Sequence, residues 1–152
     1  MKLELHLLNC FWLMLPLLAW NLILGPKISD PRITSDDHSP KGLLIAENVM
    51  RMVVFALPLL ISIRLGDSTR TAGMILYVVG TLVYFISWLP LILAPKPTWS
   101  NTTNGLLAPR ITPLFAFLGI ALIGRSWLYG LLAVLFIALH LWHGIQNIKK
   151  FN

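Results

Sequence analysis

Long runs of apolar residues alternate with more polar segments of unequal length along the whole chain. A helix rises about 1.5 Å per residue, so roughly 20 apolar residues cross the ~30 Å hydrocarbon layer of a bilayer. Four of the five runs approach this length. The pattern predicts an all-α protein, a polytopic transmembrane helix bundle with five spans that forms one integral membrane domain over residues 1–152. The runs cover residues 6–24, 43–63, 72–94, 111–124 and 127–145.

The fourth run is the weakest of the five. Its 14 residues, 111–124, extend only about 21 Å as a helix. The helix gains length if it begins near residue 106, but Pro109, Arg110 and Pro113 then lie in its first turns, and proline disrupts a helix beyond its first turn. We therefore expect a fourth span over 106–124 with an irregular start. The alternative is four spans plus one re-entrant or short helix, which moves the C-terminus to the opposite face.

Composition supports a lipid environment for most of the chain. Hydrophobic residues make up 57% and charged residues only 12%, against about a quarter charged residues in soluble domains. The net charge of +6 would suggest nucleic acid for a soluble protein. Here the basic residues flank the apolar runs, which indicates membrane orientation and contact with anionic lipid head groups. We expect the lipid bilayer as a partner and no nucleic acid.

Five crossings divide the connecting segments between two faces. The long segments 25–42 and 95–110 lie on the same face as the C-terminus, here called the long-loop face, and the N-terminus and the turns 64–71 and 124–126 lie on the other. The long-loop face carries seven Lys and Arg residues and the other face four. The positive-inside rule then favours a cytoplasmic long-loop face, with the N-terminus out and the C-terminus in. The glycosylation sequon at Asn101 favours the reverse. We expect a bacterial inner (plasma) membrane.

Polar side chains within the second run need a reason, because a central Arg or Lys costs about 2.5–3.5 kcal/mol on insertion scales. Glu47 and Arg51 are four residues apart and therefore share one helical face, in the order that suits an ion pair. Asn48 adds an amide that donates and accepts hydrogen bonds. One interpretation is a self-neutralising pair that fixes the depth of the helix. The other is a polar pocket for a ligand.

Other polar residues fall at the same face of the membrane. His140 and His143 are neighbours on one face of the last turns of the fifth run, and Arg110 precedes the fourth. With five crossings, all of these positions meet at the long-loop face. The sequence therefore predicts a ligand-binding polar cluster of Glu47, Asn48, Arg51, Arg110, His140 and His143. Two histidines without a suitable third ligand do not predict a metal site, and we expect no cofactor.

The third run carries small and hydrogen-bonding residues at steps of four and three. These are Gly73, Tyr77, Gly80, Tyr84 and Ser87. Small residues on one face allow the backbones of membrane helices to approach closely. We interpret this stripe as a packing face.

No phosphate-binding loop, nucleophile elbow or metalloprotease helix appears in the sequence. The first hypothesis is a small multipass, non-catalytic binding, accessory or transport-related subunit, with a lipid or small-molecule ligand and a second copy or another membrane subunit as partners. The second is a membrane enzyme acting on a lipid-like or quinone-like substrate, with Glu47 or His140 as acid/base and Arg51 or Arg110 holding an anionic group. The third, a haem-binding electron-transfer subunit, needs axial ligands on facing helices, and the histidines are poorly distributed for that.

Overall fold

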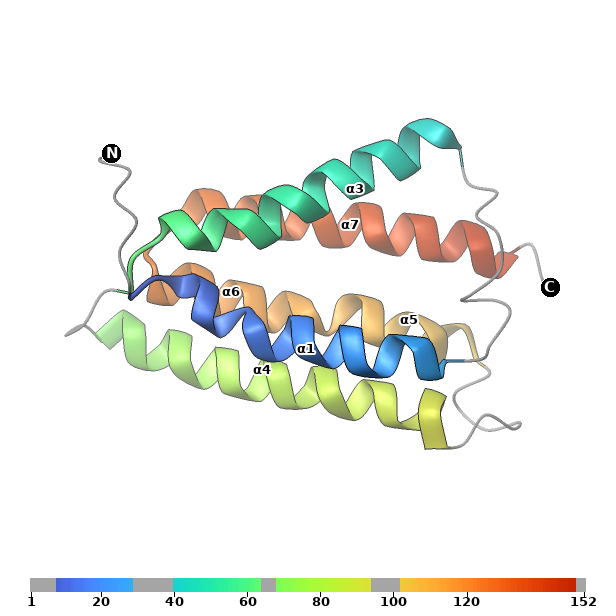
Figure 1. Cartoon of the computed structure of the whole chain (residues 1–152), viewed down its shortest axis with the longest axis horizontal. Helices are drawn as coiled ribbons and strands as arrows, with labels where there is room; N and C mark the ends of the chain where they lie inside the picture. Colours follow the sequence, from blue (N-terminus) through green and yellow to red (C-terminus); the bar gives the residue numbers. More distant parts are fainter. Residues whose placement is uncertain (1–7, 29–39, 64–67, 94–101, 150–152) are drawn as a thin grey trace.

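The structure, a computed structural model, describes residues 8–28, 40–63, 68–93 and 102–149. Its helices lie side by side with their long axes roughly parallel (Figure 1). Five segments are long and apolar enough to cross a membrane, and these are Cys10–Lys27, Lys41–Leu60, Thr69–Leu93, Thr103–Ile123 and Trp127–Ile148. The prediction of an all-α bundle with five spans is confirmed, and the fourth segment has the length of a full crossing.

Several spans are built from more than one helical element. In chain order these are η1 (Cys10–Leu13), α1 (Leu15–Leu24), η2 (Gly25–Lys27), α3 (Lys41–Ala56), η3 (Leu57–Leu60), α4 (Ser68–Leu93), α5 (Thr103–Ile111), α6 (Pro113–Ile123) and α7 (Trp127–Lys149). The second span ends earlier than the expected residue 63. Pro58 lacks the N–H that an α-helix interior requires, so the chain tightens into the 3₁₀ turn η3 and is extended from Ile61.

The fourth span begins earlier than the expected residue 106 and is divided in two. Thr102 caps α5, because its hydroxyl accepts a hydrogen bond from the Gly105 N–H at 3.1 Å. The helix is interrupted at Thr112, and Pro113 opens α6 in the first-turn position that proline tolerates. The irregular start predicted from the prolines is therefore a junction between two short helices. Together with Thr112 between them, the two helices form a segment of 21 residues, which suffices for a crossing.

The first and second spans are joined at one end of the bundle. The backbone N–H of Cys10 donates to the carbonyl of Ile61 at 2.8 Å, and that of Ile63 donates to Leu8 at 3.1 Å. Asn9 and Ser62 form the antiparallel bridge between these bonds. The opposite end, here called the long-loop end, holds the last turns of α1, α4 and α7 and the first turns of α3 and α5 (Figure 1).

Glycines bring α4 and α6 into close contact. A Cβ added to Gly80 would lie 2.6 Å from the backbone nitrogen of Ala116, and one added to Gly119 would lie 2.5 Å from that of Tyr77. No side chain fits in these gaps, so the two backbones approach as closely as small residues permit. The stripe predicted on the third run is thus the surface of α4 that packs on α6.

The remaining helices lie beside this pair and leave part of α4 exposed. α7 packs along α3 and also contacts α5 and α6. The turn η1, which precedes α1, is joined to α4 by a hydrogen bond from the Tyr77 hydroxyl to the carbonyl of Leu13, at 2.8 Å. Large apolar side chains such as Ile75, Val79 and Ile86 are exposed along α4, as expected for a helix that faces lipid. This arrangement leaves α3 and α7 with a shared polar contact at the long-loop end.

Candidate functional site

A buried carboxylate links α3 to α7. Glu47 has no exposed surface. Its Oε1 accepts hydrogen bonds from the Arg51 guanidinium, one turn along α3, and from Nδ1 of His140 at 2.9 Å. Its Oε2 accepts a hydrogen bond from Nδ1 of His143, whose Nε2 lies 3.1 Å from Nδ2 of Asn147. We call these five residues the Glu47 cluster.

The hydrogen bonds define the histidine tautomers. An ionised carboxylate only accepts, so both imidazoles donate to Glu47 through Nδ1–H. In the neutral ring the other nitrogen is an acceptor, and for His143 this Nε2 accepts from the Asn147 amide. The His140 ring is stacked on Phe136, with centroids 5.6 Å apart and planes 16° apart. Its position is therefore set by a hydrogen bond and by packing.

Arg110 reaches the same region from α5. Its side chain lies against Gly144 of α7, where an added Cβ would overlap the guanidinium group. Glycine at 144 therefore gives Arg110 the space to lie across α7, one turn beyond His140. The arginine that precedes α6 is in this way brought beside a histidine near the end of α7.

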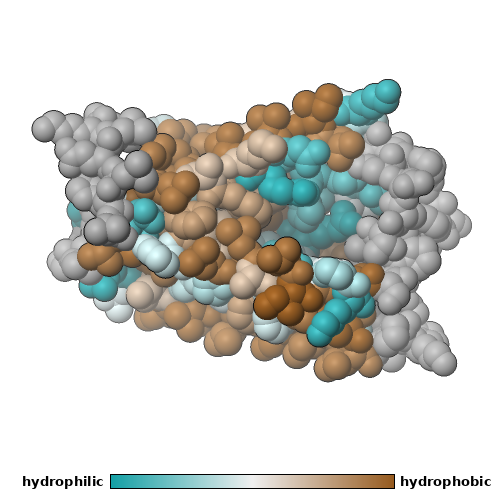
Figure 2. Space-filling view, viewed as in Figure 1, coloured by the Kyte–Doolittle hydropathy of each residue, from teal (hydrophilic) through white to brown (hydrophobic). Residues whose placement is uncertain are grey.

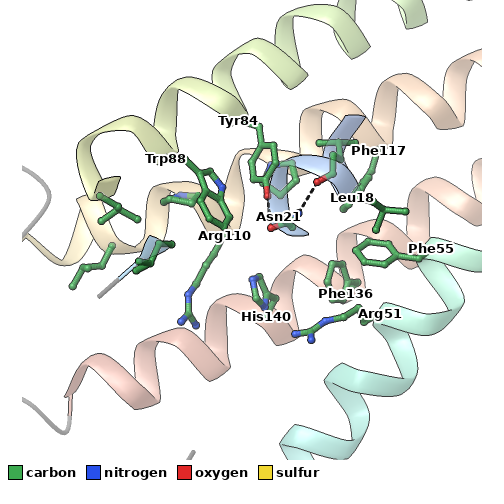
Figure 3. A pocket seen from close by; sticks show the side chains of 16 residues that line it. Leu18, Asn21, Arg51, Phe55, Tyr84, Trp88, Arg110, Phe117, Phe136 and His140 are labelled. Carbon is green, nitrogen blue, oxygen red and sulfur yellow. Dashed lines mark hydrogen bonds between the residues drawn. The ribbon is translucent and has the colours of Figure 1, made fainter. Parts of the chain in front are cut away.

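Arg51, Arg110 and His140 line a partly open cavity of about 380 Å³. Figure 3 shows the guanidinium groups of Arg51 and Arg110 on either side of His140, which together form a cationic and hydrogen-bonding wall. Most of the other lining side chains are apolar or aromatic, and these are Leu17, Leu18, Ile28, Phe55, Trp88, Leu91, Leu106, Pro109, Pro113, Phe117 and Phe136. The cavity therefore has one polar wall and a largely apolar interior.

The opposite side of the cavity is formed by α1 and α4 and has two polar side chains. The Tyr84 hydroxyl donates to Oδ1 of Asn21 at 2.7 Å, and Nδ2 of Asn21 donates to the carbonyl of Leu17 at 2.8 Å. These groups satisfy one another within the protein (Figure 3). The wall that bears Arg51 and Arg110 is therefore the side of the cavity where positively charged groups can contact a ligand.

Figure 2 shows hydrophilic side chains in a hollow on one side of the bundle, with hydrophobic side chains above and below it. Within the cluster, 42% of the Arg51 side chain is exposed, whereas the Glu47 side chain is fully buried. The cluster thus has a buried acceptor at its centre and an accessible guanidinium at its edge.

The structure brings five of the six predicted site residues together. Glu47, Arg51, His140 and His143 are directly bonded, and Arg110 borders the same cavity. Asn48 is exposed on α3 and lies outside this group. Asn21, Tyr84 and Trp88 also line the cavity. None of them was predicted as a site residue, and Tyr84 was expected only in the packing stripe of the third run. An amide isolated within the apolar first run was the available signal for Asn21.

The chemistry of this site is that of hydrogen-bond donors and exchangeable protons. Within the described ranges, no three His, Cys, Asp or Glu side chains are placed to hold a metal ion. Both oxygens of Glu47 face N–H donors instead. The groups that face the cavity can bind an anionic or acceptor-rich head group, and His140 can exchange a proton.

Together the fold and the cavity define a polytopic α-helical membrane protein with an amphipathic pocket between its helices. No protein-family model, curated protein or solved structure matches the chain. Its function is therefore inferred from the geometry of this site.

Proposed function

We propose that this protein is a non-catalytic, membrane-embedded binding protein for an amphiphile with an anionic head group and an apolar tail. A single observation carries the proposal. Two guanidinium groups and an imidazole border one side of a cavity of about 380 Å³ that is otherwise mostly apolar. This volume falls in the range of small-molecule sites, which combine an apolar lining with a few convergent polar groups.

The arginines support an anionic head group. A guanidinium has five N–H donors in a planar fork, so Arg51 can donate to Glu47 and to a second acceptor at the same time. Hydrogen bonds between ionised groups are about twice as strong as neutral ones, and the fork matches carboxylate, phosphate and similar oxyanions. Arg110 presents a second fork to the same cavity. A head group between the two arginines would receive donors from α3 and from α5.

The surfaces around the cavity support the proposal that the ligand enters from the bilayer. The hollow with the hydrophilic side chains lies on the side of the bundle, between hydrophobic surfaces (Figure 2). A tail that leaves lipid for an apolar cavity gains little free energy, because both media are apolar. Affinity and selectivity would then come mainly from the head group. The cavity is suited to a ligand with a charged head group and an apolar tail, because it has charged side chains at one wall and mostly aromatic and aliphatic side chains elsewhere.

The test compares three ten-carbon ligands that differ in head-group charge. The protein is placed in phosphatidylcholine nanodiscs, and binding of decane-1-sulfonate, decanol and decyltrimethylammonium is measured by calorimetry against empty nanodiscs. We expect the sulfonate to bind most tightly. Because a hydrogen bond to a charged group contributes about 1.5–3 kcal/mol, Arg51→Gln should weaken sulfonate binding by about tenfold or more and leave decanol unchanged.

The matched control removes the same charge at the other end of the bundle. Arg70 lies in the first turn of α4, away from the cavity, so Arg70→Gln should bind all three ligands like the wild type. Equal affinity of the wild-type protein for the three ligands would contradict the proposal. So would unchanged sulfonate binding by the Arg51 variant.

A catalytic function is the second candidate, and one contact favours it. Oε1 of Glu47 accepts a hydrogen bond from Nδ1 of His140 at 2.9 Å. Because His140 lines the cavity, this bond orients its other ring nitrogen, Nε2, so that it can act as an acid or base. A carboxylate that orients an imidazole is a frequent arrangement in enzymes. This candidate predicts that a lipid-like or quinone-like substrate is chemically altered during incubation and that His140→Gln stops the change. Recovery of the unaltered ligand supports the binding function instead.

A further inference from the structure

The Glu47 cluster also provides a place for a proton beside the proposed head-group site. We infer that binding of an anionic head group in the cavity is coupled to the uptake of one proton by His140. This inference rests on the proposed binding function and adds a proton to it. It follows from the way in which Arg51 and His140 share one carboxylate oxygen.

Arg51 connects the ligand to the cluster. Its guanidinium pairs with Oε1 of Glu47 and also borders the cavity. An anion that takes donors from Arg51 competes with Glu47 for the same cation and adds a second negative charge nearby. Two like charges 4 Å apart repel by about 4 kcal/mol at an effective dielectric constant of 20. A proton taken up between them would relieve this repulsion.

His140 is the group placed to take that proton. Its Nδ1–H is held by Glu47, so in the neutral ring Nε2 carries the lone pair. Protonation at Nε2 forms one N–H bond with a proton that hydronium or the protonated buffer gives up, and it breaks no hydrogen bond among the described residues. The resulting imidazolium keeps its bond to Glu47 and gains a donor for the head group. His143 is less suited, because protonation of its Nε2 would displace the bond from Asn147.

The charged and titratable groups around His140 set the direction of the coupling. Of the described residues, α3 contributes Glu47 and Arg51, α5 contributes Arg110, α4 contributes Tyr84, and α7 contributes His143. The lining side chains from α1 and α6 do not titrate. The two arginines oppose a positive charge on His140 when the site is empty, and a bound anion removes that opposition. Binding of the anion and binding of the proton therefore favour each other, as linkage requires.

Calorimetry with decane-1-sulfonate tests the coupling, because a sulfonate does not itself titrate near neutral pH. The binding heat is measured in bis-Tris and in Tris at one pH, two buffers that ionise with different heats and bring no oxyanion to the site, so that any difference reports protons exchanged with the buffer. We expect net proton uptake by the wild-type protein. Its affinity should fall as pH rises, by at most about tenfold per pH unit for one proton.

One histidine variant and a control locate the proton. His140→Gln retains an N–H donor for Glu47 but cannot be protonated, so it should bind sulfonate without proton uptake and without dependence on pH. Arg70→Gln, which changes a residue in the first turn of α4 at the other end of the bundle, should retain the proton uptake and the dependence on pH. Proton uptake that persists in the His140 variant would overturn the assignment to this residue.

The wild-type measurement decides the inference even if a variant fails to fold. Equal heats in the two buffers and constant affinity from about pH 5.5 to 8.5, the range in which histidine changes charge, would overturn the coupling and leave the binding function intact. Absence of sulfonate binding at every pH would instead contradict the proposed function itself.

Discussion

Replacement of Glu47 by alanine removes the acceptor that joins α3 to α7. Three donors, from Arg51, His140 and His143, lose their common partner in the interior of the bundle. Hydrogen bonds between membrane helices average about 0.6 kcal/mol, so the two from His140 and His143 contribute about 1.2 kcal/mol, while the bond from Arg51 lies within α3. Removal of one partner of a buried ion pair costs about 3–5 kcal/mol. Because Arg51 is partly exposed, we expect a loss between these two estimates, of about 1–3 kcal/mol.

Reversible unfolding in mixed detergent micelles, followed by circular dichroism, measures this change in the free energy of unfolding. Glu47→Gln should lose less, because an amide oxygen still accepts hydrogen bonds. Asn48→Ala is the matched control on the same helix, since Asn48 is exposed, and its stability should stay within about 0.5 kcal/mol of the wild type. If Glu47→Ala is as stable as the control, the carboxylate does not hold α3 against α7.

Three further predictions concern the bundle around the site. Gly80→Ala places a methyl group against the α6 backbone and should cost about 1–3 kcal/mol, whereas Gly42→Ala meets nothing within 4 Å and should be neutral or slightly stabilising; equal stability of the two variants in the unfolding assay would contradict the close packing. Tyr84→Phe removes the bond to Asn21 and should cost up to about 1.7 kcal/mol by the same measurement, and no loss would show that this bond does not support the cavity wall. Reporter fusions at the two ends of the chain should lie in opposite compartments, with the C-terminal end cytoplasmic according to the count of basic residues; readings from a single compartment would exclude five crossings.

The helices were largely predictable because lipid imposes a length and an apolar composition on each span. Their ends were less predictable, since they depend on local chemistry. Thr102 caps α5 ahead of the apolar residues, which lengthens the fourth span beyond what its apolar run suggests. Pro58 shortens the regular part of the second span within an apolar run. Caps and prolines at such positions alter a helix without altering its hydropathy.

The site was predictable in part, for a different reason. Helical periodicity places Glu47 beside Arg51 and His140 beside His143, and five crossings place both pairs at one end of the bundle. That α3 packs against α7 depends on contacts between residues more than 90 positions apart. The position of Asn21 also depends on a contact between distant residues, because Asn21 bonds to Tyr84, 63 positions away, only where α1 lies beside α4. Neither periodicity nor the number of crossings specifies which helices are neighbours.

Photolabelling tests the central claim, that the cavity beside the Glu47 cluster binds an anionic amphiphile. Decane-1-sulfonate with a diazirine at the end of its chain would be crosslinked to the protein in nanodiscs, and the labelled residues mapped by mass spectrometry. We predict labels on the cavity side chains Leu17, Phe55 and Phe117, suppressed by excess unlabelled sulfonate and reduced in Arg51→Gln. Labels confined to exposed residues such as Val79 and Ile86, unaffected by competition, would contradict the claim.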